Sequence, residues 1–174
     1  DFNRGSNEGV GYFEVNQKSG WRWNTAKAFL RPTCYGRPNV EIWNNAQVSR
    51  LVLERQADGQ LACTGAEVWT GSEMITVQAD KEVILSAGAI NSPQILQLSG
   101  IGPGELLRER GIAVEHDLPG VGANLQDHLQ IRAVFKVKNT PTLNTQANSL
   151  WGKAKIGLEY ALKRSGPMSM APSQ

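Results

Sequence analysis

The run GAINSPQILQLSGIG, residues 88–102, constrains the fold of this chain more than any other stretch. It follows directly on the apolar run KEVILSA at residues 81–87. An uninterrupted apolar segment rich in β-branched residues predicts a strand at 82–86 that is buried on both faces, as in a parallel sheet. The two runs together therefore predict a strand that leads directly into a helix.

The junction between this strand and this helix is almost free of side chains. Residues 87–89 read Ala-Gly-Ala, so that another group can approach the backbone closely. Ser92 suits the N-cap, Pro93 the first helical position and Gly100 the C-cap. A helix N-terminus beyond the carboxyl end of a strand is a common site for anions and nucleotides. An ordinary strand-to-helix connection is the alternative.

The segment ahead of this unit is rich in strand residues and in turn signals. The turn signals include Asp58-Gly59 and Gly71-Ser72, which punctuate β-branched runs. The expected strands are 40–43, 47–54, 62–69 and 74–78. The last three are joined by short turns, so we expect an antiparallel meander.

The flanking segments give weaker signals. The expected elements are a hairpin within residues 10–24, a short helix from Thr25 to a stop at Arg31-Pro32, a two-turn helix ending at Gly111, a strand at 131–138 and a helix within 148–166. Trp21 and Trp23 are expected to pack on one face of the hairpin. The last helix carries an apolar stripe that is expected to face a core, with a membrane surface as the alternative.

Composition argues against several classes of partner. The 174 residues carry 18 basic and 16 acidic side chains, a net charge of +2, and no basic block is interleaved with aromatic residues, which disfavours nucleic acid. No run approaches the length of a membrane span. Cys34 and Cys63 lie far apart without a CxxC motif, which favours idle thiols in a reducing compartment over a disulfide or a metal site.

Few residues suggest catalysis. The histidines are His116 and His128, and His128 follows Asp127, which suggests either a base with an orienting carboxylate or a structural role. No further ligands accompany them at metal spacing, and Ser86 and Ser92 lack the GxSxG elbow. The chain presents ligand-binding backbone without a catalytic set.

A second glycine loop precedes His128. Gly120-Val121-Gly122 resembles the start of a dinucleotide fingerprint, although Leu125 replaces the third glycine. An ordinary turn is the alternative.

The pattern formed by Gly88-Ala89, Ser92-Pro93, Ile95-Leu96 and residues 99–102 closely resembles a signature of the glucose-methanol-choline oxidoreductases, flavoenzymes that oxidise alcohols. Further blocks occur in the same order and are similar to the choline dehydrogenase-like branch: GWRWNTAKAFLRP, RPNVEIWNNAQVSRLVLE, GIAVEHDLPGVGANLQDHL and LNT. The resemblance covers essentially the whole chain.

This resemblance implies an α/β fold, represented here by α+β elements. Residues 1–128 would form part of a doubly wound FAD-binding domain with an antiparallel β-meander, and residues 129–174 the beginning of a substrate-binding domain. The family's GxGxxG phosphate loop is expected before residue 1 and its catalytic histidine after residue 174. The chain is accordingly interpreted as an internal piece of a longer protein.

The resemblance also implies which residues lie near the cofactor. Val48 would contact the adenine, and the turn at 86–88 would approach the ADP half of FAD. The full expected set is Val48, Ser86, Ala87, Gly88, Asn91, Ser92, Gly122, Asn124, Asp127 and His128. No catalytic or metal-binding residue is expected within the chain.

By resemblance, the longer protein is an FAD-dependent dehydrogenase or oxidase acting on choline or another primary alcohol by hydride transfer to the flavin. The isolated chain is expected to be inactive, to hold FAD weakly or not at all and to self-associate, at a cytoplasmic or membrane-peripheral location. A scaffold module without cofactor and a lyase on the same fold are the alternatives.

Overall fold

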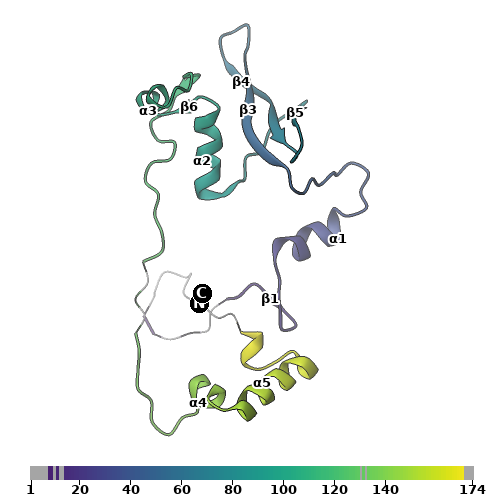
Figure 1. The fold of residues 1–174 in the computed structure, drawn as a ribbon, viewed down its shortest axis with the longest axis vertical. Helices are drawn as coiled ribbons and strands as arrows, with labels where there is room; N and C mark the ends of the chain where they lie inside the picture. The colour runs from purple at the N-terminus through teal and green to yellow at the C-terminus, as the bar shows by residue number, and fades with distance from the viewer. Residues whose placement is uncertain (1–7, 10, 12–13, 130, 132, 171–174) are drawn as a thin grey trace. The chain divides into compact units, whose positions relative to one another are not determined.

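The computed structural model describes residues 8–9, 11, 14–129, 131 and 133–170. Its contacts divide the chain into two compact units. Residues 42–131 form one, called the central unit below, and residues 1–41 together with 132–174 form the other, called the terminal unit. Figure 1 shows the helices and strands of both.

The central unit contains the predicted meander. Strands β3 (Gln47–Arg55), β4 (Leu61–Trp69) and β5 (Met74–Gln78) form an antiparallel sheet in the order β3-β4-β5. The prediction is confirmed. Compared with the predicted bounds, β3 extends one residue further at its C-terminal end and β4 one residue further at its N-terminal end. Two short turns account for this success, because they fix the pairing of adjacent strands locally.

Two local features shape this sheet. The pairing of β3 with β4 shifts register between Val48 and Arg50, which leaves Ser49 as an extra residue on β3 and bends the strand. On β4, a Cβ at Gly65 would collide with the carbonyl oxygen of Val77 on β5. Glycine therefore permits the close approach of β4 and β5.

Helix α2 (Gly88–Leu98) begins five residues before Pro93, the predicted first helical position. Gly88 has φ +90°, and this backbone turn starts the helix ahead of the Ser-Pro pair. The prediction of Ser92 as N-cap is wrong: its Oγ instead accepts a hydrogen bond from the Ala87 N–H at 2.9 Å, and Pro93 lies inside the helix. Gly100 has φ +83° just after the helix, as expected of a glycine at this position.

Three predicted strands do not form in the described part of the chain. Residues 40–43, residues 82–86 and the described part of 131–138 are irregular. An isolated strand leaves its backbone N–H and C=O groups without partners. Local sequence favours extended backbone at these places, but pairing requires a second strand that the described residues do not supply.

A short parallel pair follows α2. Strand β6 (Ile101–Gly102) pairs with β7 (His116–Asp117), and the predicted two-turn helix α3 (Gly104–Glu109) lies between them. Asp117 Oδ1 accepts a hydrogen bond from the Gly104 N–H at 2.8 Å. This contact ties the start of α3 to β7.

The core of the central unit is small. Among the described residues, the buried apolar side chains are Leu51, Val68, Ile95 and Leu107. Ser99, 8% exposed, joins β3 to α2 because its Oγ accepts from the Leu51 N–H at 2.8 Å and donates to the Ile95 carbonyl at 2.6 Å. Packing and this hydrogen-bond bridge together hold the helix against the sheet.

The terminal unit begins with the predicted hairpin. Strands β1 (Gln17–Lys18) and β2 (Trp21–Arg22) pair antiparallel, and Ser19 and Gly20 both have positive φ, as in a type I′ turn. A π-helical turn, η1 (Ala26–Leu30), continues into α1 (Arg31–Thr33). The helix ends one residue after the expected stop at Arg31-Pro32, because proline is tolerated in the first turn of α1.

The C-terminal segment of the terminal unit is helical. Its helices are α4 (Leu143–Ala147), α5 (Leu150–Lys163) and the 3-10 turn η2 (Pro167–Ser169). Ser149 caps α5 by accepting from the Gly152 N–H at 3.0 Å, and the Tyr160 hydroxyl donates to the Gly20 carbonyl at 3.2 Å. The helix within 148–166 is thus confirmed.

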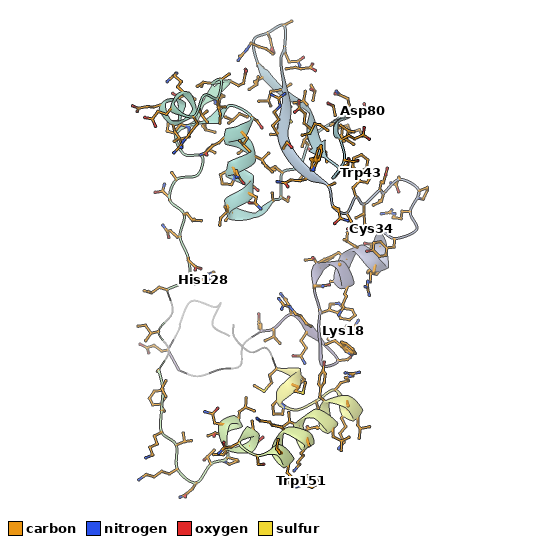
Figure 2. All side chains as sticks on the ribbon, in the orientation of Figure 1. Lys18, Cys34, Trp43, Asp80, His128 and Trp151 are labelled. Atoms are coloured by element: carbon orange, nitrogen blue, oxygen red, sulfur yellow. The ribbon has the colours of Figure 1, made fainter. Side chains whose placement is uncertain are left out.

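The apolar stripe of α5 does not face a core formed by the described residues. This stripe, formed by Leu150, Trp151, Ala154, Leu158 and Leu162, is exposed, and Figure 2 shows Trp151 projecting from the helix. Tyr160 binds the hairpin from the opposite side, which turns the stripe outward. None of the helices in the described residues has the length and apolarity needed to cross a membrane.

Candidate functional site

The turn that enters α2 is open to solvent. Ser86, Ala87 and Gly88 are exposed, and a Cβ placed on Gly88 would meet no atom within 4 Å. No side chain of the described residues caps the N-terminus of α2. The first backbone N–H groups of a helix lack partners within it and carry partial positive charge, so this surface suits an anionic group that approaches the backbone.

The glycine loop at residues 120–122 lies beside the same helix. Gln97 Nε2 donates a hydrogen bond to the Val121 carbonyl at 3.1 Å. A Cβ on Gly122 would lie 2.9 Å from this Nε2, and a Cβ on Gly102 would lie 2.9 Å from Gln97 Cγ. The Gln97 side chain therefore passes between two glycines, and only residues without a Cβ leave it that space.

Helix α2 and the loop line an open surface pocket of about 280 Å³. Its lining residues are Ala89, Ile90, Pro93, Gln94, Gln97, Gly122, Ala123 and Leu125. Known ligand pockets span about 300–1,000 Å³, so this pocket has room for part of a dinucleotide. The structure thus places Gly122 beside helix α2, which starts at the exposed turn of residues 86–88, called the bare turn below.

Val48 does not line this pocket. It lies half-buried on β3, paired with Val68 and next to the bulge at Ser49. The hydrogen bond that joins β3 to α2 is at Ser99, the end of the helix remote from Ser92. Contact between Val48 and a ligand at the bare turn stays a prediction.

The remaining predicted residues do not line the pocket. Asn91 is exposed on α2, and Asn124 is exposed with φ +56°. The Asp127 carboxylate accepts from the His128 N–H at 2.7 Å and lies 3.6 Å from His128 Nδ1. The side chains of Asp127 and His128 thus meet despite being neighbours in sequence, but both are fully exposed. Figure 2 shows His128 on an irregular stretch of chain.

Gln97 is the residue of this site that sequence reasoning missed. It is a half-buried amide within the otherwise apolar run ILQLSG and lies one helical turn after Pro93. A polar residue at this position of an apolar helix face is the signal that could have revealed it. Its hydrogen-bond partner lies 24 residues ahead, too far for a local pattern to indicate.

One ion pair of the sheet, Arg50 and Glu67, shifts the pKa values of both of its members. Arg50 donates two hydrogen bonds to the Glu67 carboxylate, from Nε at 2.8 Å and from Nη2 at 2.6 Å. These bonds lower the pKa of Glu67 and raise the pKa of Arg50, because each stabilises the charged form. The pair crosses from β3 to β4 at the surface and does not line the pocket.

Within the described residues, no cluster of three or more His, Cys, Asp or Glu side chains has the spacing of a metal site. Cys34 and Cys63 are both free thiols. The chemistry that the residues around α2 can supply is therefore binding and orientation.

Comparison with known proteins shows which family this chain is similar to. The family model described as GMC oxidoreductase matches residues 1–130. An oxygen-dependent choline dehydrogenase of Brucella anthropi is 42% identical over 166 residues, which are 95% of this chain and 29% of that protein. An alcohol dehydrogenase (acceptor) of Pseudomonas putida is 40% identical over 167 residues, again 95% of this chain and 29% of the relative.

A solved structure shares the fold. The FAD-dependent oxidoreductase from Chaetomium thermophilum superposes with a TM-score of 0.74 at 32% identity, over 87% of this chain and 26% of that one. The chain spans less than a third of the length of the curated relatives it matches. Because the family model covers well over half of its residues, the chain belongs to the GMC oxidoreductase family.

Proposed function

We propose that this chain supplies one wall of the FAD site in a longer enzyme that oxidises an alcohol. The observation that carries this proposal is the open, uncapped start of α2 at Gly88 in a chain of the GMC oxidoreductase family. A backbone turn with free space above it and partial positive charge suits the approach of a dinucleotide.

The residues fit FAD as a binding surface. Ser86, Ala87 and Gly88 offer backbone to the ADP half, and Ser92 fixes this turn through its hydrogen bond to Ala87. Asn91 lies exposed on the same helix. Val48 is proposed to contact the adenine through its backbone.

The loop after α3 is proposed to approach the flavin half. Gly122 is held against α2 by Gln97, and Asn124, Asp127 and His128 follow on the exposed continuation of this loop. When bound, FAD supplies the acceptor for a hydride from the alcohol carbon. The residues of this chain bind and orient, and none is assigned the base that takes the hydroxyl proton.

A pair of glycine variants tests the proposal in the longer protein. Gly88 and Gly59 have φ +90° and +85°, and a Cβ added at either position would meet no atom within 4 Å. Valine at either position imposes a similar backbone strain. We expect Gly88→Val to lower the flavin content, measured by absorbance near the flavin maximum, while Gly59→Val retains it. Equal flavin content in the two variants contradicts the proposal.

The isolated chain provides a second test. We expect it to show no alcohol oxidation and weak or no retention of FAD, because we propose that the phosphate loop and the catalytic histidine lie in other segments of the longer protein. Stoichiometric flavin in the purified chain contradicts this expectation. A longer protein without flavin favours the scaffold alternative, and one that holds flavin without oxidising any alcohol favours a lyase.

We further propose that the isolated chain self-associates through the exposed stripe of α5. Leu150, Trp151, Leu158 and Leu162 are each at least 60% exposed, and an apolar helix face of this kind drives association in water. Light scattering should show dimers or larger species that the double change Leu158→Lys and Leu162→Lys disperses. A monomer at high concentration contradicts the proposal, and flotation with anionic vesicles tests the membrane-peripheral location.

A further inference from the structure

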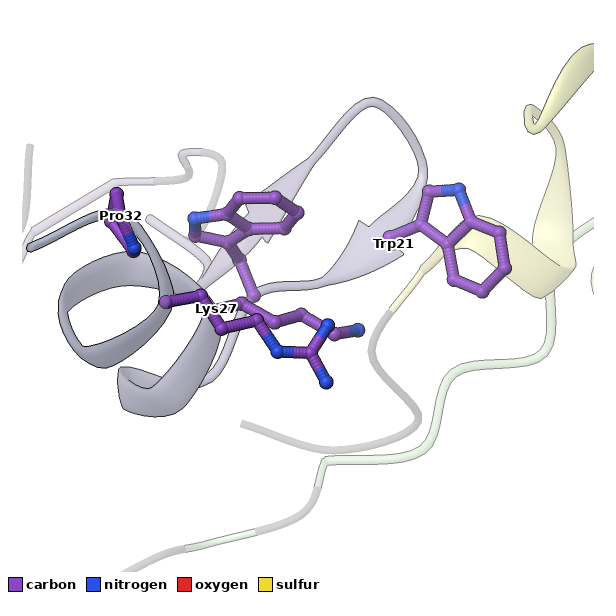
Figure 3. Close-up of a pocket in the computed structure, with 5 residues that line it drawn as sticks. Trp21, Lys27 and Pro32 are labelled. Atoms are coloured by element: carbon purple, nitrogen blue, oxygen red, sulfur yellow. The ribbon is translucent and has the colours of Figure 1, made fainter. Parts of the chain in front are cut away.

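A second pocket lies in the terminal unit and differs chemically from the surface around α2. Its volume is about 540 Å³, and its lining residues are Trp21, Trp23, Lys27, Arg31 and Pro32. Figure 3 shows it between the β1–β2 hairpin and the short helix that follows, with Trp21 and Pro32 on opposite sides and Lys27 between them. Two indoles, a proline ring and two cations thus line one shallow, open surface pocket.

The indoles are held in a strongly basic environment. Lys27 Nζ lies 5.5 Å from the centroid of Trp21 and 5.9 Å from that of Trp23. Lys18 Nζ lies 5.1 Å from Trp23, and the Arg164 guanidinium carbon lies 4.3 Å from Trp21. These distances are within the range of cation–π attraction.

The charges that line this pocket are of one sign. Lys27 and Arg31 line it, and among the described residues no acidic side chain does. The formal charges on the described lining residues are therefore all positive. A ligand ammonium group would meet cations already placed over both indoles, so the pocket does not suit a quaternary ammonium compound despite its aromatic walls.

Local hydrogen bonds orient Lys27 toward the pocket. Its Nζ donates to the Arg22 carbonyl at 3.1 Å, and its backbone N–H donates to Asn24 Oδ1 at 3.0 Å. An ammonium group has three donors, so donors remain for a ligand. Because the geometry of Lys27 is fixed in advance, binding through it loses less side-chain entropy.

We propose that this pocket binds an aromatic carboxylate. The ring packs against the indoles and Pro32, and the carboxylate accepts hydrogen bonds from Lys27 Nζ and from the Arg31 guanidinium. Apolar walls with a few fixed polar groups are the usual composition of a small-molecule site, and a carboxylate matches the fork of an arginine. This inference does not depend on the proposed function, because it uses only residues of the terminal unit.

Three small probes separate the contributions of the ring and the charge. We would titrate the purified chain with benzoate, acetate and benzyl alcohol and follow the indole N–H resonances of Trp21 and Trp23 by NMR. Benzoate is expected to shift both resonances saturably, with an affinity about tenfold above that of either acetate or benzyl alcohol, since each lacks one of the two interactions. Equal affinity for benzoate and benzyl alcohol, or absence of saturation with benzoate, would overturn the proposal.

Substitutions of the two cations that line the pocket test whether benzoate binds there. Lys27→Gln and Arg31→Gln are each expected to weaken benzoate binding about tenfold by removing a charged donor. Lys153→Gln is the matched control, because Lys153 is an exposed lysine on α5 outside the pocket. Circular dichroism verifies that each variant keeps its fold. Unchanged benzoate affinity in folded Lys27→Gln, or an equal loss in Lys153→Gln, contradicts the assignment.

Discussion

The side-chain amide of Gln97 on α2 donates a hydrogen bond to the backbone carbonyl of Val121 at 3.1 Å. This bond joins the helix that begins at the bare turn to the glycine loop that follows α3. Two surfaces that we propose to contact FAD are thus fixed to each other by one side chain, which passes between Gly102 and Gly122. Gln97 is therefore a positioning residue of the candidate site.

Removal of this amide should loosen the loop. We expect Gln97→Leu, which keeps the volume but not the hydrogen bond, to cost about 1 kcal/mol and to accelerate amide exchange at residues 121–125. Gln94→Leu is the control, because Gln94 lines the same pocket from the preceding turn of α2. Equal exchange rates in the two variants would show that Gln97 does not hold the loop.

The buried hydroxyl of Ser99 should matter more to stability than a surface hydroxyl. Ser99→Ala leaves the Leu51 N–H without its acceptor, and an unsatisfied buried donor costs about 1–3 kcal/mol. Urea denaturation measures this loss in the free energy of unfolding. Ser72→Ala, at an exposed turn, should change it far less, and a similar loss in both variants would count against the Ser99 bridge.

Two glycines with similar backbone angles should respond differently to alanine. Gly59 and Gly100 have φ +85° and +83°, so alanine at either position incurs a strain of about 1–2 kcal/mol. At Gly100 the new Cβ would also lie 2.5 Å from the Ala113 carbonyl oxygen, whereas Gly59 has open space. Thermal denaturation should therefore show a clearly larger loss for Gly100→Ala, and equal losses would contradict the close approach at Gly100.

Stability should fall in acid partly through Glu67. Because Arg50 lowers the pKa of this carboxyl in the folded state, the pair stabilises the fold fully above the unfolded-state pKa of about 4.3. This contribution is lost as pH falls through the lower folded-state pKa. Glu67→Gln should therefore be less stable than the parent at neutral pH and equally stable in strong acid. Glu73→Gln, on the turn before β5, serves as control; a pH-independent effect of Glu67→Gln would contradict the role of its charge.

The meander was predictable because its information is local. Asp58-Gly59 and Gly71-Ser72 mark turns that join neighbouring strands, and the structure pairs those strands as expected. The strand expected at 82–86 illustrates the limit. Its apolar run is consistent with burial, but strand formation depends on a partner that the sequence of the run does not specify.

The same distinction applies to the candidate site. The bare turn at 86–88 was visible because small residues cluster there, and the structure leaves it exposed. Ser92 was identified, but its role was not, since its hydroxyl binds the preceding Ala87 N–H instead of starting the helix. Gln97 was missed because its significance arises only when residues 97 and 121 meet in space.

The meander also affects the order in which the central unit can form. Its strands are consecutive in the chain, and only residues 56–60 and 70–73 separate them. Little chain entropy is lost in bringing such neighbours together, and contacts of low sequence separation form quickly. During synthesis, the three-stranded sheet can therefore assemble before α2 leaves the ribosome. Helix α2 can then pack against a sheet that already exists, with Ser99 Oγ accepting from the Leu51 N–H where the two elements meet.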